Sequence, residues 1–539
     1  MSKRNITSGV VGLLVAAIST VTVTAAAQSA GTDGQRKRPQ LVVGIVVEGL
    51  TMDYLDLLRS QFTQGGFRRL LEHGVTVSDI DYGTPLDGAA ASAVIFTGAS
   101  PSVTGIASST VYNPESKRVN SVLLDAATIG NFTSETLSPR ALSASTIADE
   151  LRIDGGGPGY VYAIAPDAAE AIVLGGHAGN SAFWINDITG KWATTTYYKD
   201  LPTPVQTLNH RTPNEFRLDT LQWTPIAPLS ALPDLPQHRK LYPFRHIFPR
   251  TSADRYRAYK NSPLVNTDIT RLATDYISIL TLGKRESTDM LNLGYTLLPF
   301  GYAREADTRA ELMDSYLRLD RDLANLFDAI DRKGPGMDNT LVFVAGTPLT
   351  QRTRRDDEKW GIPFGEFSSK KAVSLLNMYL MALYGNGEWV NGYYNGHLYL
   401  NHKLIKERDI DAKAIRRESA GFLTRMSGVS NAWTIDDVIE RRAGESPDAI
   451  HRNTSVATSG DVFVSIAPGW QEIDDDSTTD SPATSMRAAS ATAPAFFLIP
   501  GGKPEIINTP VDARRIAPTV TGILRIRSPN GASLPRLRW

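Results

Sequence analysis

The sequence predicts an α/β fold in which a mostly parallel central sheet is flanked by helices. The chain has 539 residues, of which 42% are hydrophobic and 21% are charged, so it is long enough to bury a large core. The β-branched run 40–48 has the continuous apolar character of a strand that is buried on both faces of a parallel sheet. Helical spacing of apolar residues follows this run, and strand and helix alternate again later in the chain. Such alternation is typical of α/β proteins.

The N-terminal part of this pattern is one strand followed by two helices. The apolar run 41–47 is closed by the polar residue Glu48. Segments 51–58 and 66–73 carry apolar residues at helical spacing, and Gly74 follows the second segment as a helix-stopping residue.

Further strands are expected at 159–165, 290–297 and 339–345. A helix is predicted at 315–331, because apolar residues recur there at helical spacing. The residues of this apolar stripe are Leu317, Leu319, Leu323, Leu326, Phe327 and Ile330. The charged residues between them are expected to lie mostly on the solvated face of the helix, and these are Asp320, Arg321 and Asp322.

Residues 40–535 are predicted to form a single domain with two insertions. The first insertion, 190–260, is rich in proline and aromatic residues with weak periodicity, as expected of a cap or lid. The second insertion, 350–450, is predicted to contain helices of its own. Segment 474–493 has few large apolar residues and is predicted to be a mobile loop. Residues 28–39 are expected to be a flexible segment that precedes the domain.

The N-terminus has the features of a secretory signal peptide. Lys3 and Arg4 precede an apolar run at 10–18, and small residues follow up to Ala27. We expect residues 1–27 to be removed on export, which places the mature protein in the periplasm or outside the cell. The apolar run is shorter than the ~20 residues that a membrane-spanning helix needs, so no transmembrane segment is predicted.

Charge and cysteine content narrow the range of partners. The chain has 56 Lys and Arg against 57 Asp and Glu, a formal net charge of −1. A duplex nucleic-acid binder normally has a basic excess, so nucleic acid is not expected as a partner. The absence of cysteine excludes disulfides, thiolate metal sites and a cysteine nucleophile. A zinc site would depend on carboxylates and the eight histidines, none of which are spaced as His-x-His or His-x-x-x-His.

Segments spread over nearly the whole chain resemble one family. They are VVEGLTMDYL, GGFRRLLEHGV, IFTGASPSVTGI, GGHAGNSAFW, STDMLNLGYTL, SYLRLDRDLANLFDAID, LVFVAG and RRIAPTVTGILRIRSPNGASLP. The chain is similar to the alkaline phosphatase superfamily, in the branch of secreted phosphate monoesterases and type I phosphodiesterase/nucleotide pyrophosphatases. The resemblance implies a three-layer α/β sandwich with cap insertions, a Thr or Ser nucleophile, and two zinc ions held by Asp and His.

The positions that match the nucleophile and the first ligand carry different residues in this chain. The Asp that ends the first strand in the family is Glu48 here, and Gly88 stands at the nucleophile position. Where the family has P-S-x-H-G-I, this chain has Thr104 in place of the His, and the Asn that is expected soon after falls on Ser109. Glycine has no side chain that could attack phosphorus.

The remaining matched positions differ in the same way. Where some phosphatases of this branch aim a Lys and an Arg at phosphate, this chain has Asp167 and Ala169. The other metal-ligand positions are occupied by Pro299, Ala303, Thr347, Pro348 and Thr492. Six of the seven nucleophile or metal positions have therefore lost the functional group, and Glu48 keeps a carboxylate that is one methylene longer.

We interpret the chain as a catalytically inactive member of the superfamily that binds no metal and acts by binding an envelope protein or a small ligand. With no metal beside it, Glu48 is expected either to ionise against a basic neighbour or to hold a proton. The alternative is an active, zinc-dependent phosphomonoesterase or phosphodiesterase with a rearranged site, built from Glu48, Asp87, Thr84 and carboxylates of the insertions. The candidate side chains of the remnant cleft are Glu48, Asp87, Thr104, Ser109, Asp167, Thr347 and Thr492.

Other conspicuous residues are interpreted as structural. His177, in GGHAGNSAFW, is expected to pack or to form hydrogen bonds rather than to bind a ligand. His397 and His402 are expected on a surface strand and turn rather than as a metal-ligand pair. The acidic run 474–476 is interpreted as part of a solvated loop. Neither G-x-G-x-x-G nor G-x-x-x-x-G-K-[ST] occurs at the glycine-containing segments, so no nucleotide site is predicted.

Overall fold

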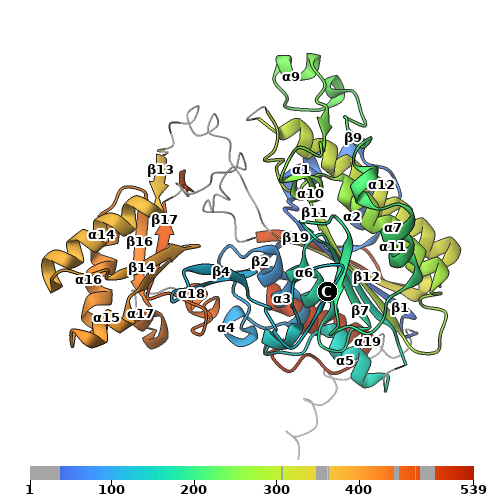
Figure 1. Ribbon diagram of the computed structural model, residues 1–539. Helices are drawn as coiled ribbons and strands as arrows, with labels where there is room; N and C mark the ends of the chain where they lie inside the picture. Colours follow the sequence, from blue (N-terminus) through green and yellow to red (C-terminus); the bar gives the residue numbers. More distant parts are fainter. Residues whose placement is uncertain are drawn as a thin grey trace, which may run out of the picture. The chain divides into compact units, whose positions relative to one another are not determined.

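The computed structural model describes residues 37–156, 158–304, 307–347, 361, 363, 365–441, 448–467, 469–473 and 492–539. The strands of its central sheet are β1 (Leu41–Glu48), β2 (Val75–Asp81), β5 (Gly130–Asn131), β6 (Val161–Ile164), β7 (Ser181–Ile185), β8 (Trp192–Thr195), β11 (Asp289–Thr296), β12 (Thr340–Thr347), β19 (Thr492–Leu498), β20 (Glu505–Ile507) and β21 (Val511–Asp512). This 11-stranded sheet has the order β20-β2-β19-β12-β1-β11-β6-β7-β8-β5, with β21 beside β2. Figure 1 labels β1, β11, β12 and β19 among its strands. The predicted α/β fold is confirmed.

Strand β1 occupies a central position in the parallel part of the sheet. It pairs in parallel with β11 and β12, in a register that places Glu48 opposite both Thr296 and Thr347. Every residue of β1 except Glu48 is buried, which explains the continuous apolar run. The carboxyl ends of these three strands therefore meet at one edge of the sheet, where polar side chains collect in α/β folds.

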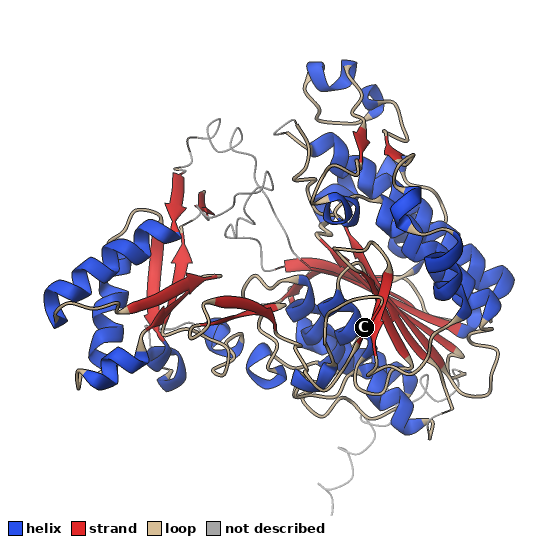
Figure 2. Cartoon of the chain, in the orientation of Figure 1, coloured by secondary structure: helices blue, strands red, loops and turns tan. Residues whose placement is uncertain are grey.

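Helices cover both faces of the sheet (Figure 2). Alternate residues of β1 separate the two cores, because Val43 and Val47 pack in one and Val42 and Val46 pack in the other. The helices of the first core are α1 (Met52–Leu58), α2 (Phe67–His73), α11 (Leu264–Ile279) and α12 (Arg309–Lys333). The helices of the second core are α3 (Gly88–Thr97), α5 (Ile147–Asp154), α6 (Ala168–Gly175) and α19 (Ile516–Leu524).

The expectation that Asp320, Arg321 and Asp322 lie on a solvated face of α12 is wrong for the two acids. Asp320 is 1% exposed and Asp322 is 4% exposed, whereas Arg321 faces solvent. The Asp320 carboxylate accepts hydrogen bonds from the backbone N–H groups of Thr63 (2.7 Å) and Phe67 (2.8 Å), at the start of α2. Burial raises the pKa of Asp322 to about 7. Periodicity identifies the apolar stripe of α12, but it does not reveal that α1, α2 and α11 cover the flanks of that stripe.

The first insertion is anchored on α12 by hydrogen bonds to buried acids. Asp314 accepts from Trp223 Nε1 (2.7 Å) and from the backbone N–H of Ile226 (2.6 Å), and Glu311 accepts from Arg239 (2.6 Å). Its elements are α7 (Thr203–Arg211), α8 (Asn214–Arg217), β9 (Gln222–Trp223), α9 (Gln237–Leu241), β10 (His246–Ile247) and α10 (Arg255–Lys260).

The second insertion has a four-stranded sheet of its own, with the order β14-β15-β17-β16. The strands and helices of this unit are β14 (Val390–Tyr394), β15 (His397–Leu400), β16 (Val429–Thr434), β17 (Val462–Ile466), α14 (Ser369–Tyr384), α15 (His402–Glu407), α16 (Ala412–Thr424), α17 (Ile435–Glu440) and α18 (Asp448–Arg452). The unit extends beyond the expected boundary at residue 450, because β15 and β16 are joined only through β17.

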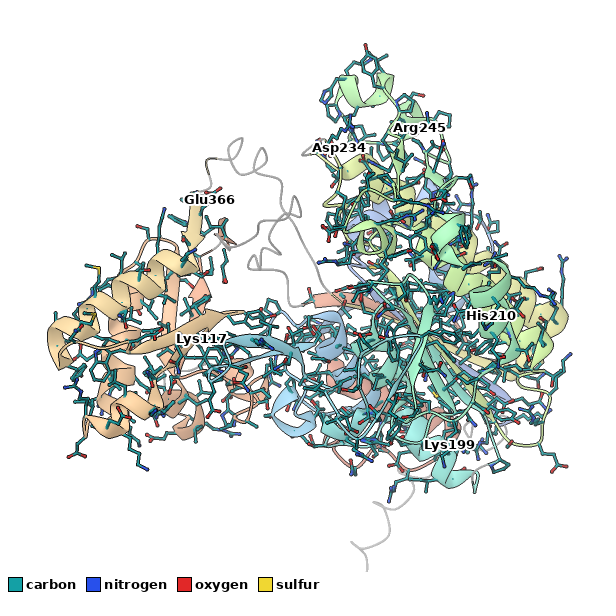
Figure 3. All side chains as sticks on the ribbon, in the orientation of Figure 1. Lys117, Lys199, His210, Asp234, Arg245 and Glu366 are labelled. Atoms are coloured by element: carbon teal, nitrogen blue, oxygen red, sulfur yellow. The ribbon has the colours of Figure 1, made fainter. Side chains whose placement is uncertain are left out.

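The hairpin of β3 (Thr110–Asn113) and β4 (Arg118–Ser121) contacts the second insertion. Lys117 at its tip (labelled in Figure 3) pairs with Glu388 at 2.5 Å. The ring of Tyr112 stacks on Tyr394 with a centroid separation of 6.2 Å. These contacts join the insertion to the polypeptide that follows α4 (Pro101–Thr104).

Several sequence predictions concern residues outside the described ranges. The proposed signal peptide, most of segment 28–39, the acidic run 474–476 and Pro348 are among them. Of the predicted mobile loop 474–493, Thr492 and Ala493 are described, and both belong to β19. Among the helices of the described residues, none combines the length and the hydropathy that crossing a bilayer requires.

Candidate functional site

Glu48 and the N-terminus of α3 lie against each other at the carboxyl edge of the sheet. Glu48 ends β1 with a partly exposed side chain, and Gly88 is the first residue of α3. A Cβ atom placed on Gly88 would lie 3.3 Å from Glu48 Oε1 and 3.4 Å from its Cδ. The fold therefore brings together the two positions that the sequence resemblance marks as first metal ligand and nucleophile.

Both carboxylate oxygens of Asp87 are engaged in local structure. Asp87 is the N-cap of α3, and its Oδ1 accepts a hydrogen bond from the backbone N–H of Ala90 (3.0 Å). Its Oδ2 accepts from Ser108 Oγ (2.7 Å) and from the backbone N–H of Ser109 (2.6 Å). Asp87 and Ser109 thus lie together beside Gly88, and their contact fixes the segment that follows α4.

Helix α6 contributes two further acids to the same place. Asp167 is the N-cap residue of α6, and Glu170 follows one turn later with 6% exposure. A Cβ atom on Gly294 of β11 would lie 2.7 Å from Glu170 Oε2, so the absence of a side chain at residue 294 makes room for this carboxyl group. We call the following four residues the acidic cluster: Glu48, Asp87, Asp167 and Glu170.

Burial and mutual repulsion raise the pKa values of two members of the acidic cluster. Burial, followed by the negative charges of Asp167 and Asp87, raises the pKa of Glu48 to about 8. Burial, followed by the charge of Glu48, also raises the pKa of Glu170 well above its usual value. Of the two expectations for Glu48, the electrostatics favour the one in which it holds a proton at neutral pH.

A buried lysine from the first insertion reaches this edge of the sheet. Lys260 at the end of α10 is 6% exposed and forms ion pairs with Asp167 and with Asp187, the latter at 2.6 Å. Burial lowers the pKa of Lys260, but the charges of Asp167 and Asp187 outweigh burial and raise it above its usual value. Lys260 and Glu170 are not among the residues that the sequence predicts for this site. For Glu170 the available signal was an acid three residues after Asp167 at the start of a helix, whereas Lys260 is remote in sequence.

The ends of β11 and β12 supply hydroxyl groups on the same face. Thr296 and Thr347 are both in register with Glu48, so their side chains point toward the side of the sheet that α3 and α6 cover. Thr347 is 0% exposed and Thr296 is 6% exposed. Within the described part of the chain, neither hydroxyl oxygen has a hydrogen-bond partner.

The two remaining candidate residues are Thr104 and Thr492, which begins the strand beside β12. Thr104 is fully buried at the end of α4, where its hydroxyl oxygen accepts a hydrogen bond from the backbone N–H of Ile106 (3.2 Å). Thr492 begins β19 and lies opposite Asp81 of β2. The fold therefore gathers Glu48, Asp87, Ser109, Asp167 and Thr347 around Gly88, and it assigns a local structural role to Thr104.

The loop that holds Pro299 and Ala303 is fixed by aromatic packing. Phe300, which is 3% exposed, lies between them in the sequence. Its ring centroid is 5.0 Å from that of Trp223 and 4.7 Å from that of His246, both in the first insertion. Apolar contacts thus hold the strand-end loop in which the resemblance implies metal ligands.

The donors at this edge do not fit a zinc pair. Zinc is held by about four ligands per ion, chiefly imidazole, thiolate and carboxylate groups that converge on one point. Among the described residues, no three His, Cys, Asp or Glu side chains are placed so that they could hold one metal ion.

Comparison with known proteins identifies the family. Residues 42–490 match the family described as type I phosphodiesterase / nucleotide pyrophosphatase. The chain belongs to this family.

Two of the relatives are named as alkaline phosphatases. The chain is 28% identical over 534 residues to the alkaline phosphatase PhoV of Synechococcus elongatus, covering 92% of each chain. It is 28% identical over 518 residues to the alkaline phosphatase PafA of Elizabethkingia meningoseptica, covering 92% of this chain and 93% of that one. A crystal structure of wild-type PafA superposes with a TM-score of 0.81 at 26% identity, over 93% of this chain and 98% of that chain. The fold is therefore that of an alkaline phosphatase of this family.

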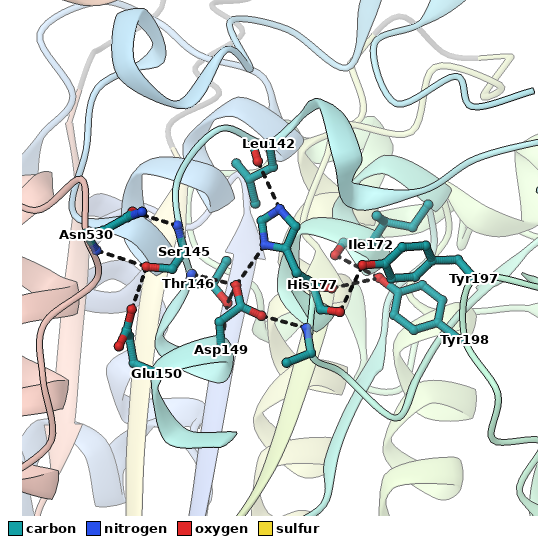
Figure 4. A network of polar contacts seen from close by, with 12 residues as sticks. Leu142, Ser145, Thr146, Asp149, Glu150, Ile172, His177, Tyr197, Tyr198 and Asn530 are labelled. Atoms are coloured by element: carbon teal, nitrogen blue, oxygen red, sulfur yellow. Dashed lines mark hydrogen bonds and ion pairs between the residues drawn. The ribbon is translucent and has the colours of Figure 1, made fainter. Parts of the chain in front are cut away.

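His177, within a segment that resembles the family, lies in a structural network (Figure 4). Its Nδ1 is 2.9 Å from Asp149 Oδ2, and its Nε2 is 2.9 Å from the backbone oxygen of Leu142. Asp149 also caps α5 together with Thr146 and accepts from the backbone N–H of Ala178. The expected hydrogen-bonding role of His177 agrees with this network.

Replacing His177 with Gln should destabilise the protein more at pH 6 than at pH 9. The hydrogen bond to Asp149 raises the pKa of His177; burial favours a higher pKa for Asp149, but the His177 contact lowers it below its usual value. When folding raises the pKa of a histidine, the stabilising contribution is fully present at pH values below the pKa of the unfolded chain, about 6.5. This contribution is lost as the pH rises through the pKa of the folded protein. We expect the free energy of unfolding to fall by ~1–2 kcal/mol at pH 6, a modest loss because the ring is partly exposed. At pH 9 the loss should be less than half as large. Urea unfolding at both pH values measures this, with exposed His238→Gln as the control, and an equal loss at both would contradict it.

The other two singled-out histidines differ from each other. His402, at the start of α15, is 57% exposed and lies 2.9 Å from Asp461, as expected of a surface turn. His397 of β15 packs against Phe463 with a centroid distance of 4.7 Å, and burial lowers its pKa to about 4. His402 thus lies at a surface turn, as predicted. His397 lies on a strand, as predicted, and its partly exposed ring packs beside Phe463, its register partner in β17.

A cavity of about 480 Å³ lies in the first insertion, beside the Lys260 ion pairs. Arg250, Arg255 and Arg257 contribute to its wall. Arg250 and Arg255 pair with Asp219 at 2.6 Å, and Arg257 pairs with Asp254 at 2.6 Å. Each of these arginines is thus already paired with an aspartate of the insertion, although Arg250 and Arg255 share one.

Proposed function

We propose that this protein is a catalytically inactive member of its family that acts by binding. The observation that carries the proposal is the contact between Gly88 and Glu48. The place of the nucleophile holds only a hydrogen atom, and a carboxyl group with a pKa of about 8 lies directly against it. Covalent phosphoryl transfer needs an activated oxygen at this position, and burial of a neutral acid does not supply one.

The neighbouring oxygen groups do not replace the nucleophile. The hydroxyl of Ser108 donates to Asp87. The hydroxyl of Thr84 accepts a hydrogen bond from Asn453 Nδ2 (2.7 Å), which belongs to the segment after α18. Asp87 itself caps α3. These contacts weigh against the alternative of an active enzyme rearranged around Glu48, Asp87 and Thr84, which the names of the relatives would favour.

Export to the periplasm or the exterior is part of the proposal. The basic start, the apolar run 10–18 and the small residues that end at Ala27 support cleavage of a signal peptide. N-terminal sequencing of protein from native envelope fractions should find a chain that begins near Gln28. A cytoplasmic chain that still begins at Met1 would refute export and leave the question of catalysis untouched.

Native protein should contain no stoichiometric zinc and should not hydrolyse aryl phosphates in a zinc-dependent manner. Its melting temperature should change by no more than about 1 °C with EDTA or with micromolar zinc, because a ligand that binds neither state cannot shift the folding equilibrium. Metal analysis, an aryl phosphate assay and thermal unfolding of the same preparation test this. PafA of Elizabethkingia meningoseptica is the positive control, and Glu48→Ala is the internal control. Zinc-dependent turnover that Glu48→Ala abolishes would establish the enzyme alternative.

A further inference from the structure

The acidic cluster is not balanced by an equal number of cations. Of the described cationic side chains, Lys260 forms an ion pair with a member of the cluster, and it is shared between Asp167 and Asp187. Glu48 and Glu170 have no basic partner among their described contacts. Besides burial, the charges of Asp167 and Asp87 raise the pKa of both, and the charge of Glu48 also raises the pKa of Glu170. A positively charged group at this place would stabilise several carboxylates at once.

Two buried hydroxyl oxygens at this place have no hydrogen-bond partner in the described structure. They are Thr296 Oγ1 at the end of β11 and Thr347 Oγ1 at the end of β12. The carboxyl group of Glu170 on α6 is buried beside them, close to the Ser92 hydroxyl on α3. The side chains of Glu170, Thr296 and Thr347 are at least 94% buried. The two threonines share their face of the sheet with Glu48, and Glu170 lies above Gly294 on that same face. Buried polar atoms without partners destabilise a fold, so their concentration at one edge favours a ligand that donates hydrogen bonds there.

The arrangement of these side chains fits a ligand that has several hydrogen-bond donors rather than a metal ion. The carboxyl groups influence one another electrostatically, yet no three described acidic or imidazole side chains could hold one metal ion. Inorganic phosphate is disfavoured because it would bring negative charge beside Glu48 and Asp87. An ammonium group has three N–H donors and no acceptor, and its hydrogen bonds to carboxylates are charge-assisted.

We propose that the acidic cluster binds an organic cation that carries a primary ammonium group. The ammonium group interacts with Glu48 and Glu170 and with the hydroxyl groups of Thr296 and Thr347. Solvent reaches this edge, since the side chain of Asp167 is 62% exposed and Glu48 and Asp87 are partly exposed. The inference rests on the proposed function, because a zinc pair in the same place would occupy these carboxylates.

Isothermal titration of the full chain tests the proposal with three probes: the diamine putrescine, its neutral isostere 1,4-butanediol, and inorganic phosphate. Putrescine should bind with a dissociation constant of ~1 mM or below, while butanediol and phosphate give no binding heat. Glu170→Gln should weaken putrescine binding about tenfold, because it removes a charge that pairs with the ammonium group. Thr347→Val keeps the shape of a buried side chain whose hydroxyl is unpaired, so it should fold normally and weaken binding about threefold.

Asp331→Asn is the matched control, since Asp331 lies outside the cluster and pairs with Arg69 on the surface. Unchanged putrescine binding in this variant, with weakened binding in Glu170→Gln and Thr347→Val, supports the site. Equal binding in all variants, or phosphate that competes with putrescine, would overturn it. Metal content and aryl phosphate turnover of the same preparation separate the two proposals. If the protein contains no zinc, hydrolyses no aryl phosphate and does not bind putrescine, only the proposed class of ligand is refuted. Zinc-dependent turnover would refute the proposed function.

Discussion

The Glu48→Gln variant should be more stable than the wild type at pH 9, by ~3 kcal/mol. Burial raises the pKa of Glu48 from about 4.5 to about 8, so the native state holds a proton that the unfolded chain releases between these values. Wild-type stability therefore falls as pH rises from about 4.5 to about 8 and then levels off. Glutamine mimics the protonated acid at every pH, so it avoids this loss.

The expected size follows from the shift. If the whole rise in the pKa of Glu48 is converted at 1.36 kcal/mol per pH unit, the free energy of unfolding changes by ~5 kcal/mol. Partial exposure of the Glu48 carboxyl group reduces this change to ~3 kcal/mol. The gain should be near zero at pH 4 and should develop between about pH 5 and pH 8. Urea unfolding at pH 4, 7 and 9 gives the profile. Glu505→Gln, at an exposed carboxyl on β20, is the control and should show no gain. A gain in stability of the variant that does not depend on pH would mean that Glu48 has the same pKa in the native protein as in the unfolded chain.

The sequence alone was sufficient for the parts of the site that lie on regular elements. The apolar run of β1 and its polar end at Glu48 are a local signal, since burial on both faces requires a continuous apolar strand. The family resemblance marked Gly88 as the nucleophile position, and the structure shows it at the start of α3 against Glu48. Thr347 was a candidate from the resemblance, whereas Thr296 is found beside Glu48 only through the strand register of the structure.

The parts that could not be predicted depend on contacts between distant segments. Lys260 reaches Asp167 from an insertion whose sequence has weak periodicity, so no local pattern signals the pair. Asp320 has the spacing of an exposed helical residue, yet its carboxylate binds backbone N–H groups near α2. Gly294 is a residue of a buried strand, and only the position of Glu170 explains why a side chain is excluded there.

The strand-end loop after β11 is held by aromatic packing. In a metal site the ligands would hold such a loop, whereas here Phe300 is buried among aromatic rings of the first insertion. Trp223 in turn is tied to α12 through Asp314. The first insertion therefore supports the acidic cluster from two sides, through this aromatic contact and through Lys260.

Trp223→Ala should loosen the first insertion and the loop around Phe300 together. Trp223 is 1% exposed, lies about 5 Å from the rings of Phe244 and Phe300, and donates a hydrogen bond to Asp314. Truncation of a buried aromatic side chain costs ~3–5 kcal/mol, and the lost donor leaves Asp314 with fewer partners. Trp223→Phe keeps most of the apolar volume and should cost only ~1–2 kcal/mol.

Limited proteolysis with mass spectrometry of the fragments measures where the loosening occurs. Trp223→Ala should expose cleavage sites within 190–260 and near Phe300, since local stability there falls while the sheet remains intact. Trp389→Ala is a matched control, because Trp389 is also fully buried and also donates one hydrogen bond, to the backbone oxygen of Gly385 in the second insertion. Its new cleavage sites should fall in the second insertion and leave 190–260 resistant. If Trp223→Ala opened the second insertion instead, or left 190–260 resistant, the aromatic contact with Phe300 would not be what holds the loop after β11.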